Sequence, residues 1–186
     1  MIDRRRLIVD VPDEAAQVAL GVDLGHACGT NALLFLRGEL GAGKTTLTRG
    51  LLRAAGHAGA VKSPTYTLIE PYELPTGRVN HLDLYRIGDL GELEYLGIEE
   101  LFERPALTLV EWPERGTGWL PTPDLDITIG YQGAGRQVVF EAARVKRFGP
   151  GTRVRSRAKV PAASMGMGTP STVSVVARPG GTSTRP

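Results

Sequence analysis

The sequence feature that most constrains the fold is a glycine-rich octapeptide that lies between two regular apolar patterns. Residues 38–45 read Gly-Glu-Leu-Gly-Ala-Gly-Lys-Thr and fit the pattern G-x-x-x-x-G-K-[ST]. The run Leu33–Leu36 precedes it and is typical of a strand buried on both faces. Leucines 47, 51 and 52 follow at helical spacing, and Gly56 is placed to end that helix. A buried strand, a glycine turn and a helix in this order predict an α/β fold.

This octapeptide is suited to bind phosphate groups. Its glycines allow a tight turn and present N–H groups without a Cβ in the way, and the helix that follows adds its positive end. Lys44 is expected to reach the β- and γ-phosphates, Thr45 to ligate Mg²⁺, and Thr46 to hold the α-phosphate or cap the helix. The other loop residues expected at the nucleotide are Glu39, Leu40, Gly41, Ala42 and Gly43. The sequence therefore predicts a P-loop that binds ATP·Mg²⁺.

The remaining patterns predict one domain over residues 1–145. Asp13 is a candidate N-cap for a helix over 14–22, and Asp89 with Glu92 resembles a capping box that opens short helices. The expected strands are 7–9, 107–110, 125–129 and 137–140, and the expected hairpin pairs 66–74 with 78–85. We therefore expect a P-loop NTPase-type three-layer sandwich, with a mixed, mainly parallel central sheet and a β-hairpin insertion.

Charge divides the chain near residue 146. Residues 1–145 hold 14 basic and 20 acidic residues, whereas residues 146–186 hold eight basic residues and no acidic one. The second segment is rich in Gly, Ser, Thr, Pro and Arg, and cannot bury enough apolar surface to offset the entropy of ordering. We expect a disordered basic tail, either a solvated extension, which is favoured, or an arm that binds RNA or a partner.

The sequence indicates a cytoplasmic protein. No apolar run approaches the ~18 residues of a membrane span, so no membrane contact is expected. The Arg4–Arg6 cluster is followed by a much shorter apolar run than the about 7–15 residues of a secretory signal. Cys28 is the only cysteine, which excludes an internal disulfide and fits a reducing compartment.

Two acidic residues are candidates for the metal site of the P-loop. Such a loop requires an acid at the end of a neighbouring strand. Glu111 follows the buried run Leu107–Val110, and this pattern favours a metal ligand over a simple strand-end residue. Asp83 shares one strand face with His81 and Tyr85, and is evenly balanced between a site acid and a surface residue.

The segment after the P-loop helix is a candidate nucleotide-sensing loop. It contains Ser63, Thr65, Tyr66 and Thr67, at the position where GTPases place such a loop. Its hydroxyls could contact the γ-phosphate or the metal, although Ser-Pro is also ordinary turn chemistry. Trp112 follows Glu111, and a tryptophan at such a position is more often a packing residue than a functional one.

Five segments together resemble one known family. GELGAGKTT, VKSPTYTLIEPY, HLDLYR, ELEYLGIEE and LVEWPERG occur in this order within residues 10–143. They resemble the TsaE (YjeE) family, the P-loop ATPase of bacterial tRNA threonylcarbamoyladenosine (t6A) biosynthesis. The resemblance implies a protein that binds ATP and Mg²⁺, hydrolyses ATP slowly, and is not itself the transferase.

The resemblance also implies partners. They are a threonylcarbamoyl transferase (TsaD-like) and its non-catalytic paralogue (TsaB-like). These two proteins modify adenosine 37 of tRNAs that read codons beginning with A, and the ATP cycle supports their repeated turnover. The chain is then expected to meet tRNA only indirectly, through this complex.

Matched residue by residue, the resemblance implies roles for the candidates. Lys44 is the phosphate lysine and Thr45 and Glu111 are the magnesium positions, while Asp83 supports the metal or positions water. Residues 63–67 match a switch-like loop.

Two further positions follow from the same resemblance. Trp112 lies near the nucleotide, and Glu14 lies near the adenine.

Three other functions use parts of the same pattern. A small-molecule kinase would need an arginine-bearing lid, and residues 1–145 contain no arginine cluster suited to one. A GTPase would need an Asn-Lys-x-Asp motif, but Asn31 and Asn80 precede Ala and His. An RNA-binding module would act through the tail. Arg86 is the only candidate arginine finger beside a site acid, which favours a slow ATPase that depends on a partner.

Overall fold

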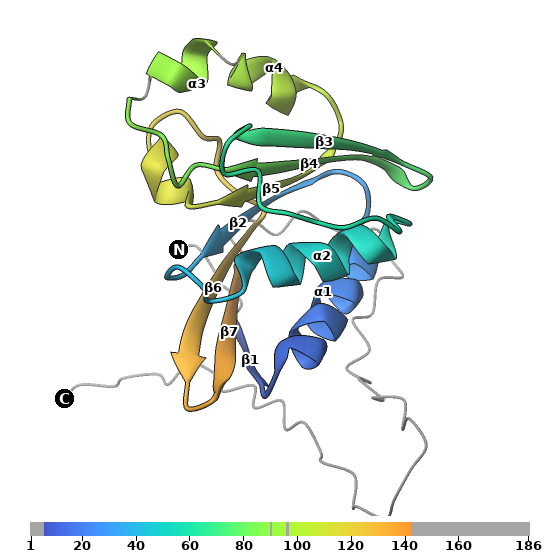
Figure 1. Cartoon of the computed structure of the whole chain (residues 1–186). Coiled ribbons are helices and arrows are strands. Elements are labelled where there is room, and N and C mark those ends of the chain that lie inside the picture. Colours follow the sequence, from blue (N-terminus) through green and yellow to red (C-terminus); the bar gives the residue numbers. More distant parts are fainter. Residues whose placement is uncertain (1–5, 90, 96, 143–186) are drawn as a thin grey trace, which may run out of the picture.

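A seven-stranded mixed sheet forms the middle layer of the computed structural model, which describes residues 6–89, 91–95 and 97–142 (Figure 1). The strand order is β1-β7-β6-β2-β5-β4-β3. The strands are β1 (Arg6–Val11), β2 (Ala32–Arg37), β3 (Ile69–Leu74), β4 (Gly77–Asp83), β5 (Leu107–Glu111), β6 (Leu125–Gln132) and β7 (Gly135–Ala142). The tail over 146–186 lies outside the described residues, so its predicted disorder stays a prediction.

Parallel pairing is confined to the centre of the sheet. Strand β2 runs parallel to both β5 and β6, and β4 runs parallel to β5. The outer pairs β1–β7, β6–β7 and β3–β4 are antiparallel. The predicted α/β sandwich with a mixed sheet is therefore confirmed, and the predicted hairpin supplies the last two strands of this sheet.

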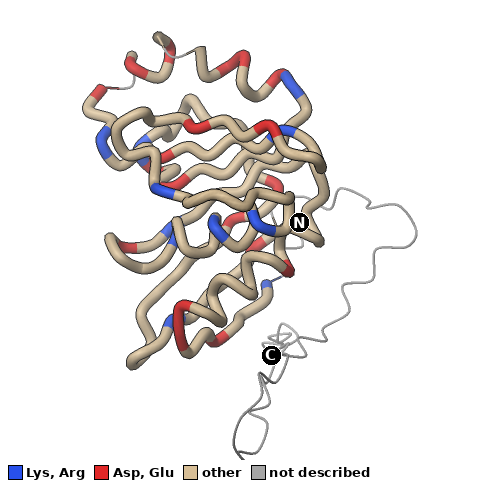
Figure 2. Tube along the Cα trace, turned by 45° about the vertical axis from the view of Figure 1, so that its right-hand side comes forward, with Lys and Arg blue, Asp and Glu red and all other residues tan. Residues whose placement is uncertain are grey.

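The helices cover both faces of the sheet. They are α1 (Glu14–Cys28), α2 (Lys44–Ala54), α3 (Gly91–Tyr95), α4 (Ile98–Glu103) and the 3₁₀ helix η1 (Pro113–Gly116). Helices α1 and α2 lie on one face, and α3 and α4 lie on the other (Figure 1). Acidic residues gather along α3 and α4 (Figure 2). No helix of the described chain has the length and apolar character that a membrane crossing requires.

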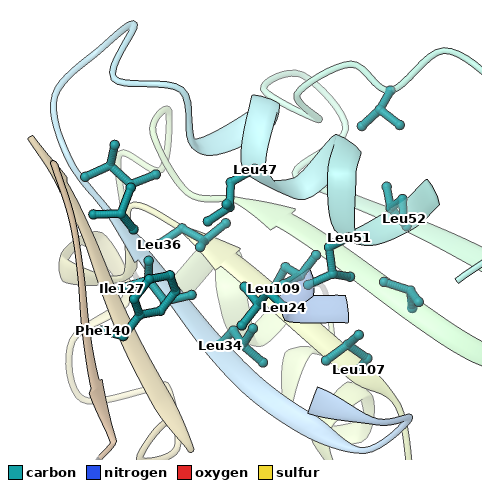
Figure 3. Close-up of a cluster of buried hydrophobic side chains, with 14 of the residues drawn as sticks. Leu24, Leu34, Leu36, Leu47, Leu51, Leu52, Leu107, Leu109, Ile127 and Phe140 are labelled. Atoms are coloured by element: carbon teal, nitrogen blue, oxygen red, sulfur yellow. The ribbon is translucent and has the colours of Figure 1, made fainter. Parts of the chain in front are cut away.

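Successive residues of the central strands pack into two separate hydrophobic cores, one on each face of the sheet. Leu34, Leu36 and Leu109 pack against Leu47 and Leu51 of α2 (Figure 3). The opposite faces of the same strands carry the second core, which includes Leu33, Phe35, Leu82, Val110, Leu93 and Ile98. Because β2 and β5 are covered on both faces, their sequences read as nearly continuous apolar runs.

Local signals begin and end the helices largely as predicted. Asp13 accepts a hydrogen bond from the Ala16 N–H at 2.8 Å, which confirms it as the N-cap of α1. This helix continues to Cys28, beyond the predicted end at Val22, because residues 23–28 contain no helix-breaking proline and the next positive φ is at Gly29. Gly56, with φ +98°, follows the C-cap of α2, and its N–H donates to the Arg53 carbonyl at 3.0 Å.

The predicted hairpin is shorter than expected at both strands, since β4 ends at Asp83 and not at Tyr85. β3 begins at Ile69, whereas the prediction began it at Tyr66. Leu68 has φ +63°, and its N–H donates to the Pro64 carbonyl at 2.7 Å. This turn removes residues 66–68 from the sheet and turns the preceding loop toward the end of β4.

Candidate functional site

The glycine-rich loop joins the carboxyl end of β2 to the first turn of α2. Gly38, Gly41 and Gly43 have φ values of +140°, +77° and +102°, in a region that residues with a Cβ rarely adopt. A Cβ at Gly38 would also lie 2.4 Å from the Ile129 carbonyl oxygen. The motif glycines are therefore required by the backbone path, and the amino end of α2 faces the loop.

A cavity of about 450 Å³ lies beside this loop and brings most of the predicted residues together. Its lining contains Leu40, Gly41, Gly43, Lys44, Thr45 and Thr46 from the P-loop, Ser63 and Thr65 from the next loop, and Asp83, Glu111 and Trp112 from the strand ends. Tyr85 and Arg86 complete it. Four segments that are distant in sequence therefore meet at one edge of the parallel strands, as open α/β sheets generally arrange their sites.

Glu111 is held beside the P-loop threonine. Its Oε1 accepts a hydrogen bond from Thr45 Oγ1 at 2.9 Å and lies 2.8 Å from Nε2 of His81. Glu111 is 2% exposed and His81 is completely buried, so these contacts are shielded from water. The geometry places a strand-end carboxylate against the hydroxyl that P-loops use for magnesium.

Asp83 lies opposite Glu111 in the β4–β5 register, but its hydrogen bonds go to the loop that contains Ser63 and Thr65. Its Oδ2 accepts hydrogen bonds from Ser63 Oγ and from Thr65 Oγ1, the latter at 3.0 Å. Its Oδ1 accepts the Tyr85 N–H at 3.0 Å. This carboxylate therefore fastens the loop over residues 63–67 to the end of β4.

Lys44 lines the same cavity as the two carboxylates and Trp112. Its Nζ donates to the carbonyl oxygens of Gly38 and Glu39 at 2.7 and 3.0 Å, and lies 4.1 Å from the centre of the Trp112 ring. Burial lowers the pKa of Lys44 from its usual value, while the carboxylates of Glu111 and Asp83 oppose that shift. The ammonium is thus poorly hydrated, which strengthens its attraction for an anion.

Trp112 adopts a backbone conformation that is rare for an aromatic residue. Its φ and ψ are +57° and +48°, in the left-handed region. The ring lies 5.0 Å from that of Tyr85, and the N–H donates to the Leu36 carbonyl at 3.3 Å. Strain of this kind costs about 1–3 kcal/mol and concentrates at functional sites. This favours the implied role of Trp112 near the ligand over simple packing.

The other predicted residues do not line the cavity. The Glu14 carboxylate pairs with Arg49 at 2.7 Å, and the Tyr66 ring lies under the Arg86 guanidinium at 4.2 Å. Thr67 is exposed. Glu39 and Ala42 belong to the P-loop backbone, where both carbonyls accept side-chain hydrogen bonds. Their roles at a nucleotide stay predictions.

Sequence reasoning missed several side chains that contact the site. Gln17, Tyr131 and Arg136 donate to carbonyl oxygens of the P-loop. They lie 25 or more positions from their partners. His81 was placed on the correct strand face, but its contact with Glu111 depends on the pairing of β4 with β5. No signal in a single sequence marks these contacts.

The donor set fits magnesium held together with a phosphate ligand. The described residues contain no group of three or more His, Cys, Asp or Glu that could hold a metal unaided. Mg²⁺ is usually bound by one or two carboxylates and by substrate phosphates, and it prefers oxygen donors. The bonded pair of Thr45 Oγ1 and Glu111 Oε1 supplies two such donors, with Asp83 close by.

Comparisons with known proteins agree on one family. The profile described as "Threonylcarbamoyl adenosine biosynthesis protein TsaE" matches residues 11–138. The chain is similar to tRNA threonylcarbamoyladenosine biosynthesis protein TsaE of Haemophilus influenzae, with 48% identity over 106 residues, covering 57% of this chain and 67% of that protein. The namesake protein of Bacillus subtilis is 40% identical over 111 residues, covering 59% of this chain and 69% of that protein. A crystal structure of YdiB from Bacillus subtilis matches with a TM-score of 0.63 and 27% identity, covering 77% of this chain and 88% of that one.

Proposed function

The chain belongs to the TsaE family of threonylcarbamoyladenosine biosynthesis proteins, and from this premise we propose that it binds ATP with Mg²⁺ and hydrolyses it slowly. The observation that carries the proposal is the 2.9 Å hydrogen bond between Thr45 Oγ1 and Glu111 Oε1. It brings the P-loop hydroxyl and a strand-end carboxylate together in the cavity that Lys44 also lines. A ligand that carries both phosphates and a divalent cation matches these groups.

The groups closest to the P-loop have defined tasks in this proposal. The P-loop amides and Lys44 bind the phosphate oxygens, and Thr45 and Glu111 hold the metal. Mg²⁺ supplies neutralisation of the negative charge on the β- and γ-phosphates. His81 keeps the Glu111 carboxylate turned toward Thr45.

Asp83 is suited to two related tasks. Its contacts with Ser63 and Thr65 link the carboxylate to a loop that lines the same cavity. When the loop lies as it does here, both Asp83 oxygens are engaged by protein donors. We therefore assign Asp83 to holding this loop at the ligand, and to accepting a hydrogen bond from water if the loop releases it.

The arrangement of arginines favours slow hydrolysis. Phosphoryl transfer is accelerated mainly by positioned positive charge, and a supplied arginine raises kcat by about 10³–10⁵ in related chemistry. Arg86 lines the cavity, but its guanidinium lies over the exposed Tyr66 ring and its Nη2 lies 3.4 Å from the Tyr66 hydroxyl. The positive charge that completes the site is thus expected from a rearrangement or a partner.

The proposed partners are those implied by the family. They are a threonylcarbamoyl transferase of the TsaD type and its non-catalytic TsaB-type paralogue, which modify adenosine 37 of tRNAs that read ANN codons. The ATP cycle of this chain then supports repeated turnover of their complex. Family membership favours this function over a small-molecule kinase that uses the same loop.

Reconstituted tRNA modification tests the proposal. Purified full-length chain is combined with both partners, tRNA and the threonylcarbamoyl donor, and modified adenosine is counted per complex. Lys44→Ala and Thr45→Ala should reduce the reaction to about one turnover. Thr45→Ser keeps the hydroxyl and Lys62→Ala removes an exposed lysine outside the cavity, so both should retain multiple turnovers. Multiple turnovers by Lys44→Ala would contradict the proposed role of ATP.

A further inference from the structure

We propose that Gln17, Tyr131 and Arg136, the three flanking side chains, are positioning residues that hold the P-loop in its phosphate-binding conformation. They come from α1, β6 and β7, outside the glycine-rich motif. The inference rests on the proposed binding of ATP, and it adds three side chains to the binding apparatus that sequence reasoning did not place there.

The contacts of the three flanking side chains cover the second half of the loop. Tyr131 Oη donates to the Leu40 carbonyl at 3.0 Å, and Arg136 Nη2 lies 3.4 Å from the Gly41 carbonyl. Arg136 Nε donates to the Ala42 carbonyl at 3.2 Å. Gln17 Nε2 reaches the carbonyls of Ala42 and Gly43, at 3.3 and 2.9 Å.

The first half of the loop is covered from within the motif. Lys44 Nζ donates to the Gly38 and Glu39 carbonyls, and the Ala42 N–H also donates to Glu39, at 3.1 Å. Every carbonyl oxygen from Gly38 to Gly43 therefore accepts a hydrogen bond. Because a peptide group points its N–H opposite to its C=O, anchoring the carbonyls on protein donors leaves the loop amides other than that of Ala42 available for an anion.

Two of the motif glycines are fitted to these side chains. A Cβ at Gly43 would lie 2.4 Å from Gln17 Nε2, and a Cβ at Gly41 would lie 3.0 Å from Tyr131 Oη. Gln17 and Tyr131 thus occupy the space that a side chain at Gly43 or Gly41 would need. The Arg136 guanidinium in turn lies 4.1 Å from the centre of the Tyr131 ring, so these two side chains support each other.

This arrangement has an energetic consequence for binding. A glycine-rich loop has more conformational freedom than other segments, and ordering it on binding subtracts from affinity. Gln17 is 3% exposed, so its contacts with Ala42 and Gly43 compete little with water. The three flanking side chains therefore order the loop before the phosphates arrive, and their loss should weaken phosphate binding in particular.

Two variants of the full-length chain test the proposal independently. Gln17→Met removes the buried donor with little change in volume. The double variant Tyr131→Phe/Arg136→Lys, the rim variant, removes the Tyr131 hydroxyl and replaces the forked Arg136 guanidinium by an ammonium, while it keeps the ring and the positive charge. Matched controls are Gln137→Met, which alters a glutamine bonded to Asp10 and Gln132, and Tyr95→Phe, which alters an exposed tyrosine of α3.

Two ligands separate phosphate positioning from contacts with the nucleoside. Each protein is titrated with MgATP, and inorganic tripolyphosphate is measured by displacement of a fluorescent ATP analogue. We expect both test variants to bind MgATP roughly 5- to 30-fold more weakly, the effect of losing about one to two kcal/mol. We expect the same factor for tripolyphosphate, with the stoichiometry of binding unchanged. Control variants should remain within about twofold of wild type.

The outcomes are distinct. A shared loss of affinity for both ligands supports the proposal. A loss confined to MgATP overturns it, because the side chains then contact the nucleoside, and affinities equal to wild type in both variants overturn it as well. If Gln17→Met does not fold, the rim variant alone decides. Failure of the wild-type chain to bind MgATP would instead refute the proposed function, which keeps the two claims separate.

Discussion

Replacement of Gly50 by alanine tests how closely α1 and α2 must approach each other. A Cβ at Gly50 would lie 2.1 Å from the Val18 carbonyl oxygen and 2.9 Å from the Cα of Gly21. A Cβ at Gly21 would similarly lie 2.2 Å from the Leu47 carbonyl oxygen. These are backbone atoms, so the two helices must separate by roughly 1 Å to admit the methyl group.

The magnitude follows from two opposing contributions. Overpacking typically costs about 1–3 kcal/mol and occasionally more, and here the clash is with backbone, so the cost should reach the upper end. Alanine in place of glycine inside a helix raises the free energy of unfolding by about 1 kcal/mol, because alanine has the higher helix propensity. We expect the free energy of unfolding to fall by about 2 kcal/mol, and Tm to fall by roughly 4–8 °C.

Urea unfolding and calorimetry of Gly50→Ala measure both quantities. Gly130→Ala is the matched control, because Gly130 lies on the exposed side of β6 with no heavy atom within 4 Å of the added Cβ. The control should stay within about 0.5 kcal/mol of wild type. A Gly50→Ala variant as stable as wild type, or more stable, would refute the close contact of the two helices.

Three further predictions concern the acid, the cysteine and the tail. In Asp83→Ala, the Ser63 and Thr65 hydroxyls lose their acceptor, so amide hydrogen exchange of residues 61–67 should become about tenfold faster. Unchanged exchange would show that Asp83 does not anchor that loop. Burial, with a smaller contribution from the Asp124 charge, raises the pKa of Cys28 from 9.0 to about 11. Between pH 9 and pH 11 the thiol ionises in the unfolded chain but not in the folded one, so the free energy of unfolding should fall by about 2 kcal/mol over this range. Urea titrations of Cys28→Ala should lack this part of the decline. A chain that ends at residue 145 should bind MgATP within about twofold of the full-length affinity, and a larger change would give the basic tail a part in the site.

The sequence predicted those features that depend on neighbouring residues. Asp13 caps α1 through a hydrogen bond to a residue three positions later, and Glu92 accepts the Asp89 N–H at 3.1 Å as a capping box requires. The buried runs Leu33–Leu36 and Leu107–Val110 became central strands. Such signals lie within a few residues, so one sequence is sufficient to read them.

Contacts between distant segments were not predictable from one sequence. The contact between His81 and Glu111 exists because β4 and β5 are neighbours, and the contacts of Gln17 and Arg136 exist because α1 and β7 flank the P-loop. Periodicity places a side chain on a face but does not say which segment covers that face. The error at the start of β3 has a similar origin, since residues 66–68 alternate like a strand but belong to a turn that Asp83 anchors.

The central claim is that the P-loop, Lys44, Thr45 and Glu111 form one site for ATP and magnesium. Isothermal titration calorimetry of the folded full-length chain tests it most directly, with ATP added in the presence of Mg²⁺ and then in the presence of EDTA. We predict one site per chain with MgATP, and binding at least about tenfold weaker without the metal, the result of losing about 1.4 kcal/mol of metal-mediated attraction. A folded chain that binds no ATP, or that binds it equally well with and without Mg²⁺, would contradict this account.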